Sequence, residues 1–465
     1  MNYLTLVNKE HLIKDSYFKY LELVDYKDVL GEDIKIEKNT LDAYLKLESF
    51  LKTKGIYIAI ESSYRSIEDQ QAIIDDFTVK YGDDYVKQYV APVKTSEHHI
   101  GLAVDLCVKI DGEFLIDIDD LLANDEVYLE IHKYLADFGF ILRYPKGKEN
   151  ITGYSYEPWH IRYVGVVPAS IIYENNLTLE EYLTDFSGIL VVNKEEGVTS
   201  RDVVNEVSKI LGIKKIGHTG TLDPMAEGVL VLTIGKATKI GELLTSYYKE
   251  YIASVDVGML TDTLDVTGKI LKEKELERSL NYQEICESFK KKYIQEVPIY
   301  SAVKVNGKKL YEYARGNEDV ILPKKEVDIK EIELLTSSEK TFKFRTLVSK
   351  GTYIRSLIRD MGDSVSEYFC MSGLIRTKQG DFSIDSSYTL DEVRDNKFKI
   401  LTLEEVLIDY PIINIDDEIL LKKIKNGCVL DNTYNVFDKV LFMYDGRIIA
   451  IYQVDNNNLK VWKML

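Results

Sequence analysis

Residues 216–239 read IGHTGTLDPMAEGVLVLTIGKATK and combine a glycine-rich loop with a run of apolar residues. Glycine and proline at this density are typical of a tight loop, which would expose His218 and Asp223 together. The apolar residues 229–235 that follow predict a strand of the core. An aspartate in such a loop most often forms a turn or caps a helix, so the loop by itself does not identify Asp223 as a catalytic residue.

The segment in front of this loop predicts a strand followed by a helix. Residues 188–194, GILVVNK, form a short apolar run, and Gly197 indicates a turn after it. A helix capped by Thr199 or Ser200 should follow, because apolar side chains then recur at three- and four-residue spacing as far as Leu211.

A domain boundary is predicted just before that strand. Residues 177–186, LTLEEYLTDF, have the periodicity of a helix with Thr178 as its N-cap, and no linker follows them. A chain of 465 residues is also too long for a single hydrophobic core. We therefore expect three domains, residues 1–186, 187–410 and 411–465, the last with a strand pair around an Asp445-Gly446 turn.

The composition is that of an ordinary globular protein, because 45% of the residues are hydrophobic and 29% are charged. Lys9 and Glu10 interrupt the N-terminal segment before it reaches signal-peptide length, and no run of about 18 apolar residues occurs in the sequence. The four cysteines have no paired spacing of the kind found in disulfide frameworks or thiolate metal sites. We expect a cytoplasmic protein without a membrane span, and no protein partner is implied.

Charge is distributed unevenly along the chain. Residues 1–186 carry 19 basic and 34 acidic residues, a net charge of −15, which leaves −3 for the remainder. The first part would repel phosphate, whereas the second part contains basic segments at 304–309 and 324–325. If RNA binds to this chain, we expect it to bind the second part.

Residues 1–186 predict an α+β domain with its chemistry in three short segments. The expected elements are a helix over 39–54, a strand over 56–62, one or two helices over 67–90, a strand over 101–108 and a helix over 125–138 that closes at Gly139. The chemical segments are SSYRSIEDQ (62–70), SEHHIGLAVD (96–105) and EPWHIRYVG (157–165). They contain two histidines and two carboxylates that suit a catalytic zinc ion and its base, although a single histidine in such a pattern is usually structural.

The three segments, in this order, resemble the D-alanyl-D-alanine carboxypeptidases of VanY type, the zinc LAS peptidases. The resemblance covers about residues 3–184 and implies an α+β zinc peptidase domain that acts on D-Ala-terminated peptides. His99 occupies a variable position of the motif, so we expect it not to be a ligand. The implied site residues are His98, Asp105 and His160 as Zn²⁺ ligands, Glu157 as catalytic base, Arg65 as oxyanion or substrate contact, and Ser96 and Gln70 as further substrate contacts.

The glycine-rich loop resembles the signature loop of TruB-type tRNA pseudouridine synthases. Segments at 249–251 (KEY), 258–268, 297–315 and 349–362 follow in the order of that family. The resemblance implies a mixed, largely antiparallel α+β catalytic domain with a small PUA-like β module after it, and tRNA, through its T-arm, as partner. It also implies isomerisation of uridine 55 without a metal or other cofactor. The chain departs from the family pattern at Glu195, where Pro is usual, and at Ile375, where Arg is usual.

The resemblance also assigns roles in the second part. Isomerisation needs a carboxylate that attacks the sugar and an aromatic residue on which the flipped base stacks. The implied residues are Asp223 as nucleophile, Tyr251 as stacking residue and base, Arg355 as ion-pair partner of Asp223, and Tyr353, Leu374 and His218 as substrate contacts. We expect Arg355 to lower the pKa of Asp223, and Tyr353 and Arg355 to share one face of a strand over 352–356.

Two alternatives to a bifunctional enzyme remain open. In the first, residues 1–186 form a binding or scaffold module without catalysis, and only the synthase is active. In the second, the two domains are an accidental fusion of neighbouring reading frames.

Overall fold

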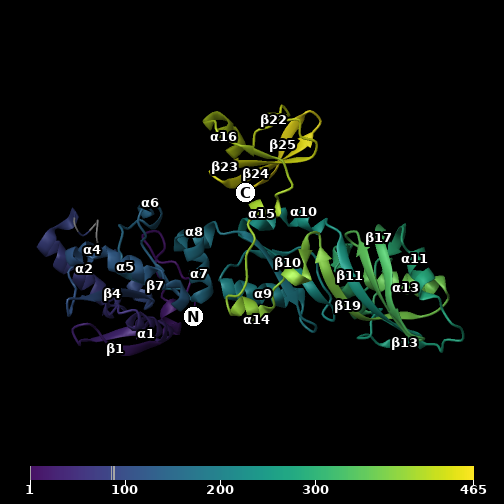
Figure 1. Cartoon of the computed structure of the whole chain (residues 1–465), viewed down its shortest axis with the longest axis horizontal. Coiled ribbons are helices and arrows are strands. Elements are labelled where there is room, and N and C mark those ends of the chain that lie inside the picture. The colour runs from purple at the N-terminus through teal and green to yellow at the C-terminus, as the bar shows by residue number, and fades with distance from the viewer. Residues whose placement is uncertain (1, 85, 87–89) are drawn as a thin grey trace. The chain divides into compact units, whose positions relative to one another are not determined.

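The computed structural model describes residues 2–84, 86 and 90–465 and divides into two compact units (Figure 1). One unit runs to Phe186 and includes Ile210–Ile213, and the other consists of Ser187–Lys209 with Lys214–Leu465. Of the helices predicted over 67–90, α2 spans Ile67–Tyr81, and residues 85 and 87–89 lie outside the described part. Within the described residues, no helix has the length and apolar character needed to cross a membrane.

The first unit is built on an antiparallel sheet with strand order β3-β4-β7-β6, to which β5 adds at β4. Strands β1 and β2 pair separately. The strands are β1 Leu23–Lys27, β2 Asp33–Glu37, β3 Ile58–Ser62, β4 Ala103–Ile110, β5 Glu113–Phe114, β6 Phe140–Leu142 and β7 His160–Tyr163. The helices are α1 Lys38–Thr53, α4 Ile118–Ala123, α5 Asp125–His132, α6 Glu149–Thr152, α7 Val166–Glu174 and α8 Leu179–Thr184, with 3₁₀ turns η1 Tyr17–Tyr20, η2 Glu97–Ile100 and η3 Ala136–Phe138.

Amphipathic periodicity explains how α1 covers this sheet. Tyr44, Leu47 and Leu51 recur at three- and four-residue spacing and are buried in one core with Ile58 and Val104 of the sheet. The helix predicted over 39–54 is therefore confirmed.

The helix predicted over 125–138 is only partly correct. Helix α5 ends at His132, and a short 3₁₀ turn, η3, follows before Gly139. The tighter turn buries Leu135 against the sheet, and the amide of Phe140 donates to the carbonyl of Leu135 at 3.0 Å. Gly139 closes the segment at φ 82°, where a Cβ atom would lie 2.8 Å from the ring of Tyr163, so both the backbone conformation and the space require glycine.

The second unit is built on a nine-stranded sheet with the path β14-β17-β18-β11-β19-β10-β8; β20 pairs with β19 and β9 with β10. All pairs are antiparallel except β10 with β19. The strands are β8 Gly188–Lys194, β9 Ile216–His218, β10 Glu227–Ile234, β11 Lys249–Val257, β14 Lys292–Glu296, β17 Lys324–Ser337, β18 Thr341–Val348, β19 Phe369–Gln379 and β20 Phe382–Ser383, with separate pairs β12 Met259–Thr261 and β13 Ile270–Glu273, and β15 Lys304–Val305 and β16 Lys308–Lys309. The helices are α9 Ser200–Leu211, α10 Gly241–Thr245, α11 Tyr282–Ser288, α12 Leu310–Gly316, α13 Ile354–Ser364, α14 Leu390–Arg394 and α15 Leu403–Val406, with 3₁₀ turns η4 Gly235–Ile240 and η5 Ile384–Ser386.

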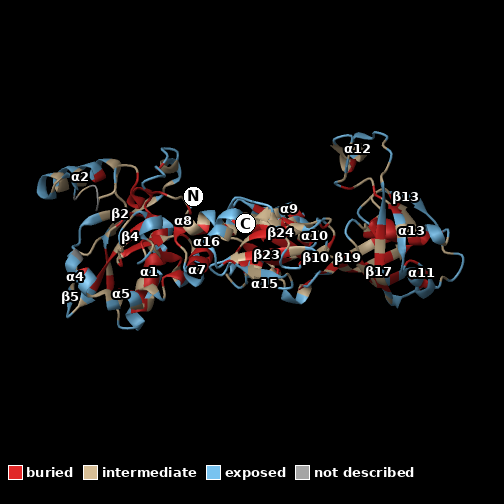
Figure 2. Ribbon diagram, turned by 90° about the horizontal axis from the view of Figure 1, so that it is seen from above, coloured by how far each residue is buried: buried red, intermediate tan, exposed pale blue. Residues whose placement is uncertain are grey.

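The strand predicted over 352–356 is wrong, because this segment starts helix α13. Tyr353 is the residue before the helix, and Arg355 lies in its first turn. Ile354, Leu357 and Ile358 pack into the core of the sheet, and Figure 2 shows α13 as largely buried. This three- and four-residue spacing is that of a helix, but it only becomes visible over a longer window than the five residues TYIRS.

The C-terminal residues form a sheet of their own, drawn in yellow in Figure 1. Its strand order is β21-β23-β24-β25-β22, with the bounds β21 Ile412–Asn414, β22 Leu430–Asp431, β23 Lys439–Tyr444, β24 Arg447–Asp455 and β25 Asn458–Met464, and α16 spans Glu418–Lys425. Asp445 and Gly446 connect β23 to β24 with φ of 50° and 72°, which confirms the predicted turn. Assignment of residues 411–465 as a PUA-like RNA-binding module remains a prediction.

Candidate active sites

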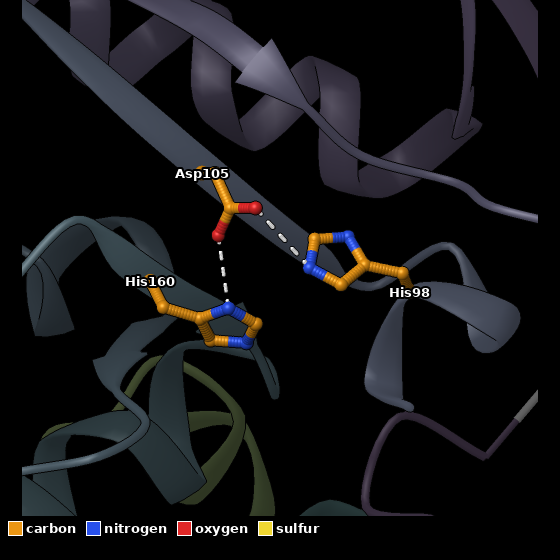
Figure 3. Close-up of side chains that lie close together, drawn as sticks. All are labelled: His98, Asp105 and His160. Atoms are coloured by element: carbon orange, nitrogen blue, oxygen red, sulfur yellow. Dashed lines mark ion pairs between the residues drawn. The ribbon is translucent and has the colours of Figure 1, made fainter. Parts of the chain in front are cut away.

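Three residues of the first unit form a candidate metal centre (Figure 3). His98 lies on η2, Asp105 on β4 and His160 at the start of β7, where the register of the two strands pairs it with Asp105. Asp105 Oδ2 lies 3.2 Å from His98 Nε2, and Asp105 Oδ1 lies 2.9 Å from His160 Nδ1. One ligand atom from each residue lies within 4.8 Å of the others, so the segments bring the three predicted ligands together.

The donor atoms fit a zinc ion. His98 Nδ1 lies 2.6 Å from the carbonyl oxygen of Ser63 and donates to it, which leaves the lone pair of Nε2 facing Asp105. Asp105 Oδ1 is buried without a hydrogen-bond partner despite its contact with His160. Two imidazoles and one carboxylate, with space for a further ligand, are the donor set of many catalytic zinc sites.

The protonation of this cluster reflects the closeness of opposite charges. Burial favours the neutral imidazole of His160, but Asp105 outweighs burial and raises the pKa of His160 to about 10. Burial likewise opposes ionisation of Asp105, yet His98 and His160 hold its pKa below the usual range. Asp105 is therefore anionic beside a protonated His160, and a metal cation bound to the three residues would replace that proton.

The predicted catalytic and substrate residues of the first unit line one cavity with the metal centre. Its volume is about 470 Å³, and its lining includes Arg65, Gln70, Ser96 and Glu157. Arg65 donates to Gln70 Oε1 at 3.0 Å and to Ser62 Oγ at 3.2 Å, which holds its guanidinium in place. Burial raises the pKa of Glu157 to about 7, so this carboxyl can gain and lose a proton near neutral pH.

His99 lies outside the group formed by His98, Asp105 and His160. The amide of Lys94 donates to its Nε2 at 3.3 Å, and its Nδ1 lies 2.8 Å from the carbonyl oxygen of Arg65. His99 therefore supports the loop that carries Arg65.

Sequence reasoning missed a buried ionic network behind His160. Glu97 Oε1 accepts hydrogen bonds from Arg143 Nε at 2.8 Å and from Arg162 Nη1 at 2.7 Å, and all three side chains are fully buried. Glu97 Oε2 lies 3.9 Å from His160 Nε2. Arg143 also donates to both carboxylate oxygens of Glu180, at 3.0 and 2.6 Å. The available signal was an arginine in each of the apolar segments FILRY and HIRYV, since a buried arginine requires an acid.

In the second unit, Asp223 and Arg355 form the expected ion pair, with Arg355 Nε 3.0 Å from Asp223 Oδ2. Arg355 is buried and also donates to the carbonyl oxygens of Thr263 at 2.8 Å and Tyr300 at 3.0 Å. A second buried carboxylate, Asp265, lies 3.6 Å from its Nη1. Asp265 escaped sequence reasoning, although it lies inside the family segment 258–268.

The pKa of Asp223 differs from the expectation. Arg355 lowers it, but burial has the larger effect and Asp265 adds to it, so the net pKa of Asp223 is raised above its ordinary value. Arg355 is therefore needed to limit this rise rather than to produce an unusually acidic group.

Anchors on both sides hold the loop that carries Asp223. The ammonium of Lys194, which is fully buried, donates to the carbonyls of Glu195, Val198 and Pro224 at 2.7, 2.7 and 3.3 Å. Ser200 Oγ accepts from the amide of Leu222 at 2.9 Å and donates to its carbonyl at 3.1 Å. The cap of α9 is Thr199, whose side chain accepts from the amide of Asp202, which leaves Ser200 for the loop.

The remaining predicted residues lie on several elements of the second unit. Tyr251 on β11 and Leu374 on β19 are buried in one apolar cluster with Leu222, the neighbour of Asp223. Burial raises the pKa of Tyr353, and the charge of Asp223 raises it further, which indicates that the two side chains are close. His218 ends β9, with a buried Nδ1 that has no hydrogen-bond partner in the described structure, and burial lowers its pKa.

Two families of known proteins match different parts of the chain. Residues 208–354 match the family model described as TruB family pseudouridylate synthase (N terminal domain), and residues 33–166 match that of D-alanyl-D-alanine carboxypeptidase, VanY. The tRNA pseudouridine synthase B of Caldanaerobacter subterraneus subsp. tengcongensis is 43% identical over 267 residues, which cover 57% of this chain and 93% of that protein. The tRNA pseudouridine synthase B of Bacillus pumilus is 42% identical over 286 residues, with 57% and 92% covered.

A solved structure is also similar in sequence to part of this chain. The vancomycin resistance D,D-pentapeptidase VanY from a VanB-type resistance cassette, in complex with Zn(II), is 34% identical, with 38% of this chain and 97% of that chain covered and a TM-score of 0.32. From the sequence matches, the chain belongs to the tRNA pseudouridine synthase B family and carries a domain of the VanY D-alanyl-D-alanine carboxypeptidase family in front of the synthase.

Proposed function

We propose that the second unit converts uridine 55 in the T-arm of tRNA to pseudouridine with Asp223 as nucleophile. The observation that carries this proposal is the ion pair of Asp223 with the buried Arg355, on a loop that Lys194 and Ser200 hold in place. A fixed carboxylate with a cationic partner is what an attack on the sugar requires.

The proposed reaction needs no metal or redox cofactor. Asp223 attacks C1′ of the flipped nucleotide as the N1–C1′ bond breaks, and the freed uracil turns so that C5 bonds to C1′ and expels Asp223. Tyr251 stacks on the base and accepts the C5 proton, while N1 takes up a proton from solvent, and Leu374 forms an apolar wall of the pocket. We assign His218 and Tyr353 to contacts with the flipped nucleotide, and residues 411–465 to binding the T-arm.

The test is tritium release from tRNA labelled at C5 of uridine. Wild-type protein should release label from a tRNA with uridine at position 55 and not from one with cytidine there. Asp223→Asn should lose activity by at least about 1,000-fold while it still binds tRNA. Release that persists after Asp223→Asn would refute the assignment of the nucleophile, and equal release from both tRNAs would refute the assignment of position 55.

For the first unit we propose a zinc-dependent carboxypeptidase or dipeptidase that releases D-alanine from D-Ala-D-Ala peptides. His98, Asp105 and His160 would hold the metal, which would act as a Lewis acid on the scissile carbonyl. Glu157, with its pKa near neutral, takes a proton from the attacking water and passes it to the leaving amine. Arg65 faces the same cavity and stabilises negative charge on the substrate. Both proposed substrates occur in the cytoplasm, where we expect the protein to work.

The first measurement is D-alanine release by the zinc-loaded full chain from D-Ala-D-Ala and from longer D-Ala-D-Ala-terminated peptides. Chelation and Glu157→Gln should each reduce release by at least about 100-fold, and Asp223→Asn should leave it unchanged because that residue lies in the other unit. A protein that binds zinc but releases D-alanine from none of these peptides would support the alternative in which the first unit is a non-catalytic scaffold.

A further inference from the structure

We propose that Glu97 is a positioning residue for the candidate metal ligand His160. Its carboxylate accepts a hydrogen bond from Nε2–H of the imidazole, and this bond keeps the lone pair of Nδ1 directed at the metal. The inference rests on the proposed zinc peptidase and adds to its metal centre the residue that fixes the tautomer of one ligand. Glu97 acts through His160 and not on the substrate.

The first observation is that two buried polar atoms without other partners face each other. His160 Nε2 lies 3.9 Å from Glu97 Oε2. Both atoms are buried, and neither has a hydrogen-bond partner within the described residues. A movement of about 1 Å would bring them to hydrogen-bond distance. Buried polar atoms are nearly always paired, and an imidazole N–H and a carboxylate oxygen suit each other as donor and acceptor.

The second observation is that the other nitrogen of His160 faces the metal centre. Nδ1 lies 2.9 Å from Asp105 Oδ1 (Figure 3). A neutral imidazole carries one proton, so a proton on Nε2 leaves the lone pair on Nδ1. Histidines that bind a metal generally donate their second N–H to a carbonyl or carboxylate oxygen. His98 meets this requirement with the carbonyl oxygen of Ser63 at 2.6 Å, and Glu97 meets it for His160.

The third observation is that the carboxylate and the imidazole ring are both held in place. Glu97 Oε1 accepts hydrogen bonds from Arg143 Nε at 2.8 Å and Arg162 Nη1 at 2.7 Å. Because both arginines bind the same oxygen, Oε2 is left to face His160. Tyr144 packs against the ring of His160, with ring centroids 4.9 Å apart. The two groups therefore meet in a defined orientation.

The test measures zinc affinity on the full chain by competition with a chelator of known affinity, without a peptide. A neutral amide is a weaker acceptor than a carboxylate, so Glu97→Gln should weaken zinc binding by about 10- to 100-fold. The matched control is Glu180→Gln, which removes the same charge from the same network, since Glu180 accepts from Arg143 at 3.0 and 2.6 Å. Within the residues that the structure describes, no hydrogen bond or ion pair joins Glu180 to His160, so this variant should keep the wild-type zinc affinity.

Two results would overturn the inference. Zinc affinity that is the same in Glu97→Gln and the wild type would remove any role of Glu97 at the metal. An equal loss of affinity in both variants would show that zinc binding depends on the buried network as a whole, which is a purely structural role.

A second measurement needs no change at Glu97 and holds even if Glu97→Gln does not fold. The chain has six histidines, so selective ¹⁵N labelling of their imidazoles gives a simple NMR spectrum, in which His160→Asn identifies the signals of His160. In the zinc-loaded full chain we expect a proton on Nε2 that exchanges slowly with solvent and is donated to Glu97. A proton on Nδ1 instead would refute the proposed tautomer.

D-alanine release measured in parallel separates this inference from the proposed function. Zinc affinity that depends on Glu97 in a chain that releases no D-alanine would uphold the positioning role and refute the peptidase. Release of D-alanine by a chain whose zinc affinity does not depend on Glu97 would uphold the peptidase and refute the positioning role.

Discussion

Replacing Arg355 by Met should shift the pH dependence of pseudouridine formation. The guanidinium lies 3.0 Å from Asp223, and two unit charges about 4 Å apart interact by about 4 kcal/mol at an effective dielectric constant of 20. The Asp223 side chain is 37% exposed, so solvent screening reduces this to about 2 kcal/mol. At 1.36 kcal/mol per pKa unit, loss of the partner should raise the pKa of Asp223 by about 1.5 units.

The direction follows from the state that reacts. Asp223 must be ionised to attack C1′, so activity falls as pH drops through its pKa. The pKa is already raised in the wild type, and Arg355→Met should raise it further, so the acid limb of the pH–rate profile moves to higher pH by about 1.5 units. Much of the lost activity should then return in alkaline buffer.

Tritium release from C5-labelled tRNA, measured under single-turnover conditions between pH 5 and 9, follows this limb. Arg355→Lys is the control, because it keeps the charge and loses the fork that also binds the carbonyls of Thr263 and Tyr300. It should lose activity with little movement of the limb. A profile for Arg355→Met that falls uniformly at every pH would refute this electrostatic account and leave Arg355 a purely structural role.

Three further changes should have distinct effects. Lys194→Met removes three hydrogen bonds from a buried ammonium to backbone carbonyls, including that of Pro224. It should cost about 2–4 kcal/mol of unfolding free energy and slow tritium release, and unchanged thermal unfolding would contradict this anchor. Zinc at about 1,000 times its Kd should stabilise the first unit by about 4 kcal/mol in thermal unfolding. Asp105→Asn should abolish this stabilisation. If zinc still stabilised the variant, the metal would bind elsewhere. Glu97→Gln leaves buried Arg162 without its acid and removes one of the two acids that pair with Arg143, so it should cost about 3–5 kcal/mol at pH 7, measured by denaturant unfolding. Because the arginines hold the pKa of Glu97 below its ordinary value although burial opposes them, that stability is lost as pH falls, so the difference from wild type should narrow in acid and not in alkali.

The elements with clear local signals were predictable. The apolar run 188–194 is β8 in full, and Thr178 caps α8 through a reciprocal pair of hydrogen bonds with Glu181. The turn at Asp445-Gly446 is also present, because its conformation depends on those two residues alone. Two predictions of secondary structure were wrong. The five residues TYIRS were too few to show the helical spacing at the start of α13, and packing of Leu135 against the sheet ends α5 earlier than the sequence pattern suggests.

The candidate sites divide in the same way. The resemblance of the motifs, in their order along the chain, to two known families was enough to single out His98, Asp105, His160, Asp223 and Arg355, although each of these residues alone has a common structural explanation. The buried residues that hold these side chains in place could not be predicted from the motifs. A fully buried Lys194 or Glu97 carries no local signature, since what makes each of them stable is a set of acceptors or arginines contributed by distant segments.

The sequence by itself therefore determined which two families the chain resembles, because the motifs that carry each resemblance lie in short segments. Only the tertiary structure decided how these groups are charged and held. Burial reverses the expected net pKa shift of Asp223, and the register of β4 and β7 places His160 opposite Asp105. Desolvation and strand register depend on residues far apart in the chain, so no local pattern contains them.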